Sequence, residues 1–148
     1  MRLCVVLFIL LASLAEAEVV RVAVDNFPPY SQVHADGTVS GVNVDIVNLV
    51  ASKMNLTVEY VQCPWVRCLK LLDTGEVDLM SGVLHTRERD EKFEFIFPPY
   101  ESVSSNSVHF YQLSSNPLIN TEEDLIDKII AVQRGVVYTP EFDNNSRI

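Results

Sequence analysis

Strand-like and helix-like apolar patterns alternate between residues 19 and 80 of this 148-residue chain, and this alternation constrains the fold more than any other feature. Runs rich in β-branched residues predict strands, and apolar residues three or four apart predict helices. The expected elements are a strand at 19–24, a helix at 42–54, a strand at 56–61, a helix at 64–74 and a strand at 77–80. Such alternation is typical of a parallel sheet with right-handed crossovers, so the sequence predicts the α/β class.

The helix expected at 42–54 is amphipathic. Asp45, Asn48, Ser52 and Lys53 form its polar face. Its apolar residues at helical spacing are Val42, Ile46, Leu49, Val50 and Met54, and we expect these five to face the core.

The second half of the chain has weaker patterns. Further strands are expected at 93–97, 104–112 and 129–132. The polar, proline-bearing stretch 113–117 suits a linker or crossover, and Thr121 with the acids after it is typical of a helix start.

The first 17 residues have the pattern of a secretory signal peptide. Arg2 is followed by an apolar run at 5–11 that is too short to span a bilayer comfortably, and Ala15-Glu16-Ala17 has the small-x-small form of a cleavage site. An N-terminal membrane anchor is the alternative, which the cleavage triplet disfavours. We therefore expect cleavage near Ala17 and a mature chain that is periplasmic or otherwise secreted.

Charge and cysteine content narrow the function further. A formal net charge of −9 disfavours nucleic acid and anionic membranes as partners. Cys63 and Cys68 remain once Cys4 leaves with the signal, and an oxidising compartment favours a disulfide between them over two free thiols. Their spacing fits no usual metal pattern and no histidine lies nearby in the sequence, so we expect no metal. We expect no cofactor either.

The segment 81–90 carries the best candidate for an anion site. Gly82 follows a predicted strand, Thr86 is a candidate N-cap of a short helical turn, and the guanidinium of Arg89 can take a carboxylate in two parallel hydrogen bonds. The alternative is a surface arginine paired with Glu88 or Glu91.

Ligands of open parallel sheets bind outside the carboxyl ends of the strands. Asp25, Trp65 and Gly82 follow three such ends. Tyr30 and Trp65 could stack on a ligand or fill the core, and Asp25 could receive an amino group or cap the following turn.

Together these residues resemble the extracellular solute-binding proteins of family 3, the soluble receptors of ABC importers for polar amino acids. Gly41 to Ile46 is similar to the family's marker near the first helix, with Asn43 in place of an acid. Thr86-x-x-Arg89 resembles its carboxylate-binding segment. Asp25 and the loop from Phe27 to Tyr30 lie where the family places its first ligand loop, and Trp65 is similar to a common variant of the wall over the ligand.

The resemblance implies a type II periplasmic-binding-protein-like fold, in which two α/β lobes close on a ligand. By this analogy residues 1–17 are the signal peptide, 18–112 are lobe one, and 113–148 are the hinge crossing and an incomplete start of lobe two, so that the sequence is truncated after lobe one. Residues 132–135 resemble the lobe-two anion loop, with Val136 and Val137 where hydroxyl residues are common.

The function implied by the resemblance is capture of a small carboxylate-bearing solute, an amino acid, for a membrane permease of an ABC importer. The expected ligand-binding residues are Asp25, Phe27, Tyr30, Trp65, Gly82, Thr86 and Arg89. An enzyme of the same architecture is the alternative, either a small-molecule dehydratase or the front domain of a peptidoglycan-cleaving enzyme, although no acid/base pair or nucleophile is evident. A third interpretation is a truncated gene product without a stable function.

Overall fold

The computed structural model describes residues 17–100 and 109–148. The chain forms two compact units, one that ends at Val83 and one from Leu84 to Ile148. Within the described residues, no helix combines the length and apolar character needed to cross a bilayer. The apolar run at 5–11 lies outside the described residues, and the predicted boundary at residue 112 stays a prediction.

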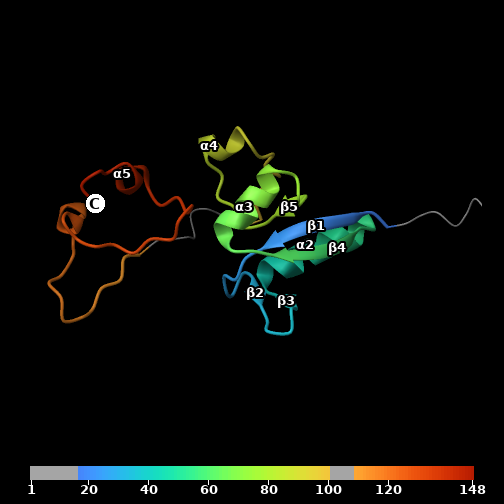
Figure 1. Cartoon of the computed structure of the whole chain (residues 1–148), viewed down its shortest axis with the longest axis horizontal. Helices are drawn as coiled ribbons and strands as arrows, with labels where there is room; N and C mark the ends of the chain where they lie inside the picture. The colour runs from blue at the N-terminus through green and yellow to red at the C-terminus, as the bar shows by residue number, and fades with distance from the viewer. Residues whose placement is uncertain (1–16, 101–108) are drawn as a thin grey trace, which may run out of the picture. The chain divides into compact units, whose positions relative to one another are not determined.

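A three-stranded parallel sheet forms the centre of the first unit. Strand β1 (Val19–Val24) lies between β4 (Thr57–Gln62) and β5 (Leu79–Met80), and both neighbours run parallel to it. The connections contain α2 (Val42–Met54) and α3 (Trp65–Asp73), which lie on opposite sides of the sheet in Figure 1. The predicted α/β class is therefore confirmed.

An ion pair holds β5 beside the start of β1. Arg21 Nη2 lies 2.9 Å from Asp78 Oδ1, and the Arg21 backbone N–H donates to Asp78 Oδ2 at 2.8 Å. The Asp78 N–H in turn donates to the Arg21 carbonyl at 2.8 Å. These bonds fix the register of the short β5, which leads directly into the segment 81–90.

The face that α2 buries differs from the expected one. Its buried residues are Asn43, Val44, Val47 and Ala51, whereas Val42, Leu49, Val50 and Met54 are exposed. Apolar residues cover a wide arc of this helix, so spacing alone does not select the stripe that packs. Tyr60 of β4 helps to select it, because its hydroxyl donates to the Val44 carbonyl at 3.2 Å.

A small hairpin precedes α2. Its antiparallel strands are β2 (Gln32–Val33) and β3 (Val39–Ser40), with Gln32 opposite Ser40. The Thr38 N–H donates to Asp36 Oδ1 at 2.9 Å, and Gly37 has a φ of 86°. The hairpin returns the chain to the loop at 27–31.

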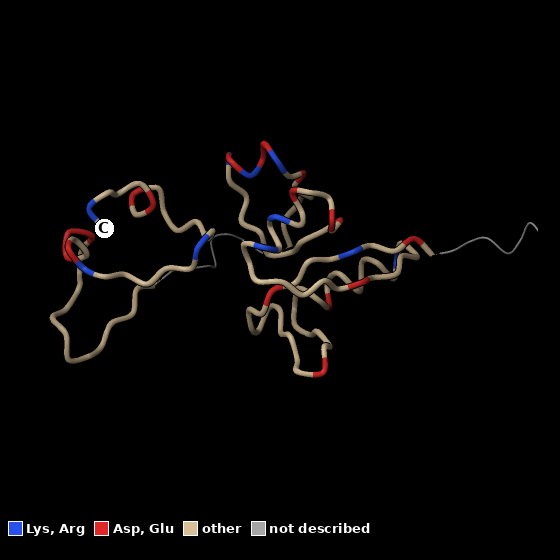
Figure 2. Tube along the Cα trace, in the orientation of Figure 1, with Lys and Arg blue, Asp and Glu red and all other residues tan. Residues whose placement is uncertain are grey.

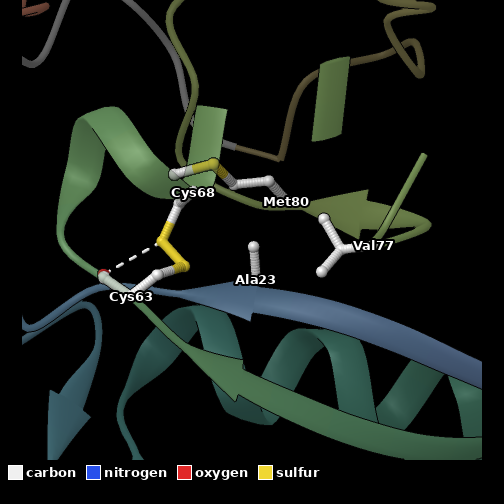
Figure 3. Packing of buried hydrophobic residues seen from close by; sticks show 5 residues of the cluster. All are labelled: Ala23, Cys63, Cys68, Val77 and Met80. Carbon is white, nitrogen blue, oxygen red and sulfur yellow. Dashed lines mark hydrogen bonds between the residues drawn. A yellow bond between two sulfur atoms is a disulfide. The ribbon is translucent and has the colours of Figure 1, made fainter. Parts of the chain in front are cut away.

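A core cluster joins α3 to the sheet (Figure 3). Its buried residues are Ala23, Cys63, Cys68, Val77 and Met80. Cys63 and Cys68 form a disulfide, with their sulfur atoms 2.01 Å apart. Cys68 Sγ also lies 3.0 Å from the Cys63 carbonyl oxygen, the dashed line in Figure 3. A bridged sulfur carries no proton, so we regard this as a close contact rather than a hydrogen bond.

The second unit contains only short helical turns among its described residues: α4 (Arg87–Asp90), the 3₁₀ turn η2 (Glu122–Leu125) and α5 (Pro140–Asp143). The predicted helix start at Thr121 is confirmed by η2. The strands predicted at 93–97 and 129–132 are wrong, and 109–112 is not a strand either. Residues 104–108 lie outside the described part. A strand requires a neighbour that completes its ladder, and apolar character alone does not supply one.

Candidate functional site

The carboxyl ends of the three parallel strands lead to three of the predicted ligand residues. Asp25 directly follows β1, Trp65 comes three residues after β4, and Gly82 comes two residues after β5. Parallel strands place these ends at one edge of the sheet, the edge where ligands bind in open α/β sheets. The topology of the first unit therefore agrees with the predicted placement of these three residues.

Asp25 is a half-buried carboxylate, and burial raises the pKa of its carboxyl group above the usual range. No Lys, Arg or His of the described chain forms an ion pair with it. The cap of the following turn comes instead from its neighbour, since Asn26 Oδ1 accepts the Val33 N–H at 3.0 Å. A desolvated carboxylate of this kind is stabilised by a cation placed against it.

Phe27 and Tyr30 form a stacked pair after Asp25. Their ring centroids are 5.8 Å apart and the rings are inclined by only 12°. The loop between them is closed by two backbone hydrogen bonds, from Phe27 N–H to the Ser31 carbonyl at 2.7 Å and from Ser31 N–H to the Phe27 carbonyl at 3.0 Å. Phe27 is 56% exposed, so the pair offers an aromatic face to solvent or to a ligand.

Trp65 and Gly82 have clear local roles. Trp65 is the first residue of α3, is half-buried and packs against the core cluster, so part of its ring contributes to the core. Gly82 has a φ of 77°, a conformation that glycine adopts without a steric penalty. The structure thus accounts for a glycine at position 82 through its backbone.

Thr86 and Arg89 belong to the second unit and are connected through α4. Thr86 is the N-cap, as predicted, and its Oγ1 accepts the Arg89 backbone N–H at 3.3 Å. Both side chains are half-buried. Along α4 basic and acidic residues alternate (Figure 2).

Backbone carbonyls hold the Arg89 guanidinium. Nη1 donates to the Leu84 carbonyl and Nη2 to the Gly135 carbonyl, each at 2.9 Å. Burial lowers the pKa of Arg89 below its usual value, yet an arginine remains charged at any physiological pH. The planar end of the side chain is therefore oriented by main-chain acceptors, and the nearby Glu88 carboxylate favours its charged form.

Sequence reasoning missed two contacts around α4. Gly135 is 46 residues from Arg89, and no local pattern predicts such a pair. His85 is the second case, because sequence reasoning assigned it no role. Its Nε2 lies 3.1 Å from Asp90 Oδ1, and its ring contacts the rings of Phe95 and Phe97 edge-on. An isolated histidine gives no such signal in a single sequence.

The second unit also contains an open cavity of about 310 Å³. Arg134, Gly135 and Tyr138 are among the residues that line it. The Tyr138 hydroxyl accepts the Gln133 N–H at 3.0 Å. None of the seven predicted ligand residues lines this cavity. In the described part of the chain, no group of three or more His, Cys, Asp or Glu residues is placed to hold a metal ion.

Comparison with known proteins identifies one family. The family described as "Bacterial extracellular solute-binding proteins, family 3" matches residues 20–142. A probable histidine-binding protein of Neisseria gonorrhoeae is 34% identical over 86 residues, which are 57% of this chain and 32% of that protein. A probable histidine-binding protein of Campylobacter jejuni is 25% identical over 113 residues, 76% of this chain and 42% of that protein.

The matched part of the chain thus spans 32% to 42% of the length of these curated relatives. Among solved structures, an ancestral cationic amino acid solute-binding protein is 31% identical, with 49% of this chain and 33% of that chain covered and a TM-score of 0.45.

Proposed function

The chain belongs to the bacterial extracellular solute-binding proteins of family 3, and from this membership we propose that it binds a small amino acid as a receptor rather than transforming it as an enzyme. The observation that carries the proposal is the guanidinium of Arg89. It is half-buried, charged and held at both terminal nitrogens by backbone carbonyls.

Arg89 and Thr86 have the chemistry to bind the carboxylate of the solute. Two carbonyls orient the planar guanidinium, and a guanidinium can bind a carboxylate through two parallel hydrogen bonds. Thr86 fixes the first turn of α4 from which Arg89 projects. Gly82 precedes this turn and gives the chain its change of direction at a φ of 77°.

Asp25, Phe27 and Tyr30 have the chemistry to bind an amino group and a side chain. The half-buried Asp25 carboxylate is stabilised by an ammonium ion. The stacked rings of Phe27 and Tyr30 favour a flat or cationic side chain through their π faces. Trp65 contributes the part of its ring that the core does not cover.

The proposed setting is outside the cytoplasm. The signal-like residues 1–17 support export, with cleavage near Ala17, into the periplasm or beyond. The natural receiver of the solute is the membrane permease of an ABC importer, as for receptors of this family. The relatives named as probable histidine-binding proteins make histidine the first solute to test, followed by the other amino acids.

Isothermal titration calorimetry of the chain against these amino acids tests the proposal. We expect Arg89→Lys to weaken binding roughly tenfold or more, because an ammonium cannot form two parallel hydrogen bonds to a carboxylate. Arg87→Lys is the matched control, since Arg87 lies on the same turn and is exposed. Equal affinities of the two variants would contradict the assignment of Arg89, and absence of binding by the wild-type chain would refute the function.

A further inference from the structure

The loop from Phe27 to Tyr30 is attached to the start of α2 by two backbone hydrogen bonds. The Asn43 N–H donates to the Tyr30 carbonyl at 2.9 Å, and the Val42 N–H donates to the Pro29 carbonyl at 3.3 Å. The first N–H groups of a helix have no acceptor within the helix, and a side chain at the N-cap commonly supplies one. No side chain caps α2, so the carbonyls of the loop take this role.

Gly41 makes this attachment sterically allowed. It is the N-cap of α2, with a φ of 121° and a ψ of 172°. A Cβ at this position would lie 2.4 Å from the Tyr30 carbonyl oxygen and 2.8 Å from that of Pro29. Any side chain at 41 must therefore push both carbonyls away from the N–H groups that they accept.

The hairpin explains why residues 30 and 41 meet. Gln32 of β2 pairs with Ser40 of β3, so the chain returns beside the loop just before α2 begins. The loop thus has no freedom to move without breaking either the hairpin or the start of the helix.

We propose that Gly41 is a positioning residue for the contact of the Phe27 and Tyr30 rings with the solute. Gly41 acts through the Tyr30 and Pro29 carbonyls and touches no solute itself. Tyr30 carries both the anchored carbonyl and one ring of the stacked pair, so a displaced carbonyl moves the aromatic face. This inference rests on the proposed function, because it presumes that the aromatic pair binds part of the amino acid.

Gly41→Ala tests the proposal, with Gly37→Ala as the matched control. Gly37 also has a positive φ, 86°, but an added Cβ would have nothing within 4 Å. Both positions have a positive φ that strains an alanine, and only Gly41→Ala adds a clash with backbone carbonyls. We expect Gly41→Ala to weaken binding of the best amino acid roughly tenfold, and Gly37→Ala to leave it within about twofold. Equal affinities of the two variants would overturn the proposal.

A double-mutant cycle separates positioning from general damage. In a background that carries Phe27→Ala and Tyr30→Ala, the aromatic face is gone, so Gly41→Ala should cause no further loss of affinity. The same loss in both backgrounds would show that Gly41 acts elsewhere and would overturn the proposal.

A measurement without ligand keeps the two proposals distinguishable. We expect the Asn43 amide to exchange with solvent faster in Gly41→Ala than in the wild type or in Gly37→Ala, and the Tyr30 ring proton shifts to change with it. Unchanged exchange and shifts would overturn the positioning role even where binding is intact. Absence of amino-acid binding by the wild type would refute the proposed function alone, and these spectra would still decide whether Gly41 positions the loop.

Val42→Pro is the second variant if Gly41→Ala does not fold. Proline is tolerated at the first position of a helix, and it removes the N–H that donates to Pro29. One of the two attachments is lost while Gly41 is kept, so we expect a smaller but measurable loss of affinity. Wild-type affinity in this variant would overturn the role of the attachment.

Discussion

Helices begin differently in the two units of the chain. In the first unit, α2 has 13 residues and α3 has 9, and neither has a side-chain cap. In the described residues of the second unit, each helical turn has 4 residues and begins at a threonine: Thr86, Thr121 and Thr139. The long helices are held by packing against a sheet, whereas the short turns depend on hydrogen bonds between neighbours in sequence.

Burial shows the same contrast. The first unit buries Val22, Ala23 and Val24 of β1 together with the core cluster around the disulfide. Among the described residues of the second unit, Leu125 is the buried apolar side chain, while Tyr111 is 91% exposed. Apolar residues stabilise a fold only where an opposing surface covers them. The stability of the first unit should therefore come from tertiary packing, and that of the second unit from hydrogen bonds between neighbours in sequence.

Removal of the disulfide should have the largest effect. Cys63→Ala with Cys68→Ala should lower the free energy of unfolding of the first unit by about 3 kcal/mol, since the bridge restricts the unfolded chain and sits in the core. Urea unfolding followed by Trp65 fluorescence measures this, because Trp65 is the only tryptophan. Hydrogen exchange of the second-unit amides should not change. An unchanged urea midpoint would contradict the view that the first unit is stabilised by its packed core.

A matched valine pair sharpens the comparison. Val22→Ala should cost about 2 kcal/mol, because Val22 is 1% exposed and the smaller side chain leaves a cavity. Val132→Ala removes the same atoms from a side chain that is 54% exposed. This substitution should change the free energy of unfolding by no more than about 0.5 kcal/mol. The urea midpoints of the two variants check this prediction. Similar costs would mean that the second unit also has a packed core.

Loss of a threonine cap should act locally. In Thr139→Ala, α5 loses the hydroxyl that accepts the Phe142 N–H at 3.2 Å, which should cost about 1 kcal/mol of the stability of that turn. Hydrogen exchange of the Asp143 amide, which donates to the Thr139 carbonyl, should become roughly fivefold faster. Thr139→Ser keeps the hydroxyl and serves as the control. A lowered urea midpoint of the first unit would contradict the local assignment.

Substitution of two aspartates should change stability least, and the two changes should have opposite signs at pH 7. Burial raises the pKa of Asp25, so its charge opposes folding above that pKa, and Asp25→Asn should increase stability at pH 7. This gain should vanish as the pH falls below the ordinary aspartate pKa of about 4. Thermal unfolding at pH 7 and at pH 3 measures the difference.

Asp124 is the counterpart in the second unit. Backbone N–H groups of Asn120 and Thr121 hold the pKa of its carboxyl group below the usual value, so it contributes stability that is present above about pH 4 and is lost as the pH falls through the lowered pKa. Asp124→Asn should therefore weaken η2 at pH 7, seen as faster amide exchange at 122–125. A gain of stability would contradict the assigned bonds.

Single-sequence patterns predicted the first unit well and the second poorly. The α/β class, the family and its type II periplasmic-binding fold were predicted from the residues and are confirmed. The strands predicted at 93–97 and 129–132 were wrong, because their apolar residues suit a strand but no segment among the described residues pairs with them. The ligand roles of Asp25, Phe27, Tyr30, Trp65, Gly82, Thr86 and Arg89 stay predictions.

Helix caps and helix starts could be predicted from the sequence wherever a residue interacts with its neighbours in the chain. The N-cap role of Thr86 and the start of α3 after Pro64 each depend on a few adjacent residues, and the sequence by itself determined them. The parallel direction of the strands was also predicted, because strands that alternate with helices form parallel sheets, whereas the order of the strands was not predicted.

Tertiary structure alone decided the contacts between residues distant in sequence. It selected Val44, Val47 and Ala51 as the buried face of α2, in place of the more apolar face expected from spacing. It also brought the Gly135 carbonyl into hydrogen-bond distance of Arg89, and the Tyr30 carbonyl next to Gly41. The physical reason is the same in each case: packing and hydrogen bonding depend on which surfaces meet, and spacing along one chain does not encode the partner.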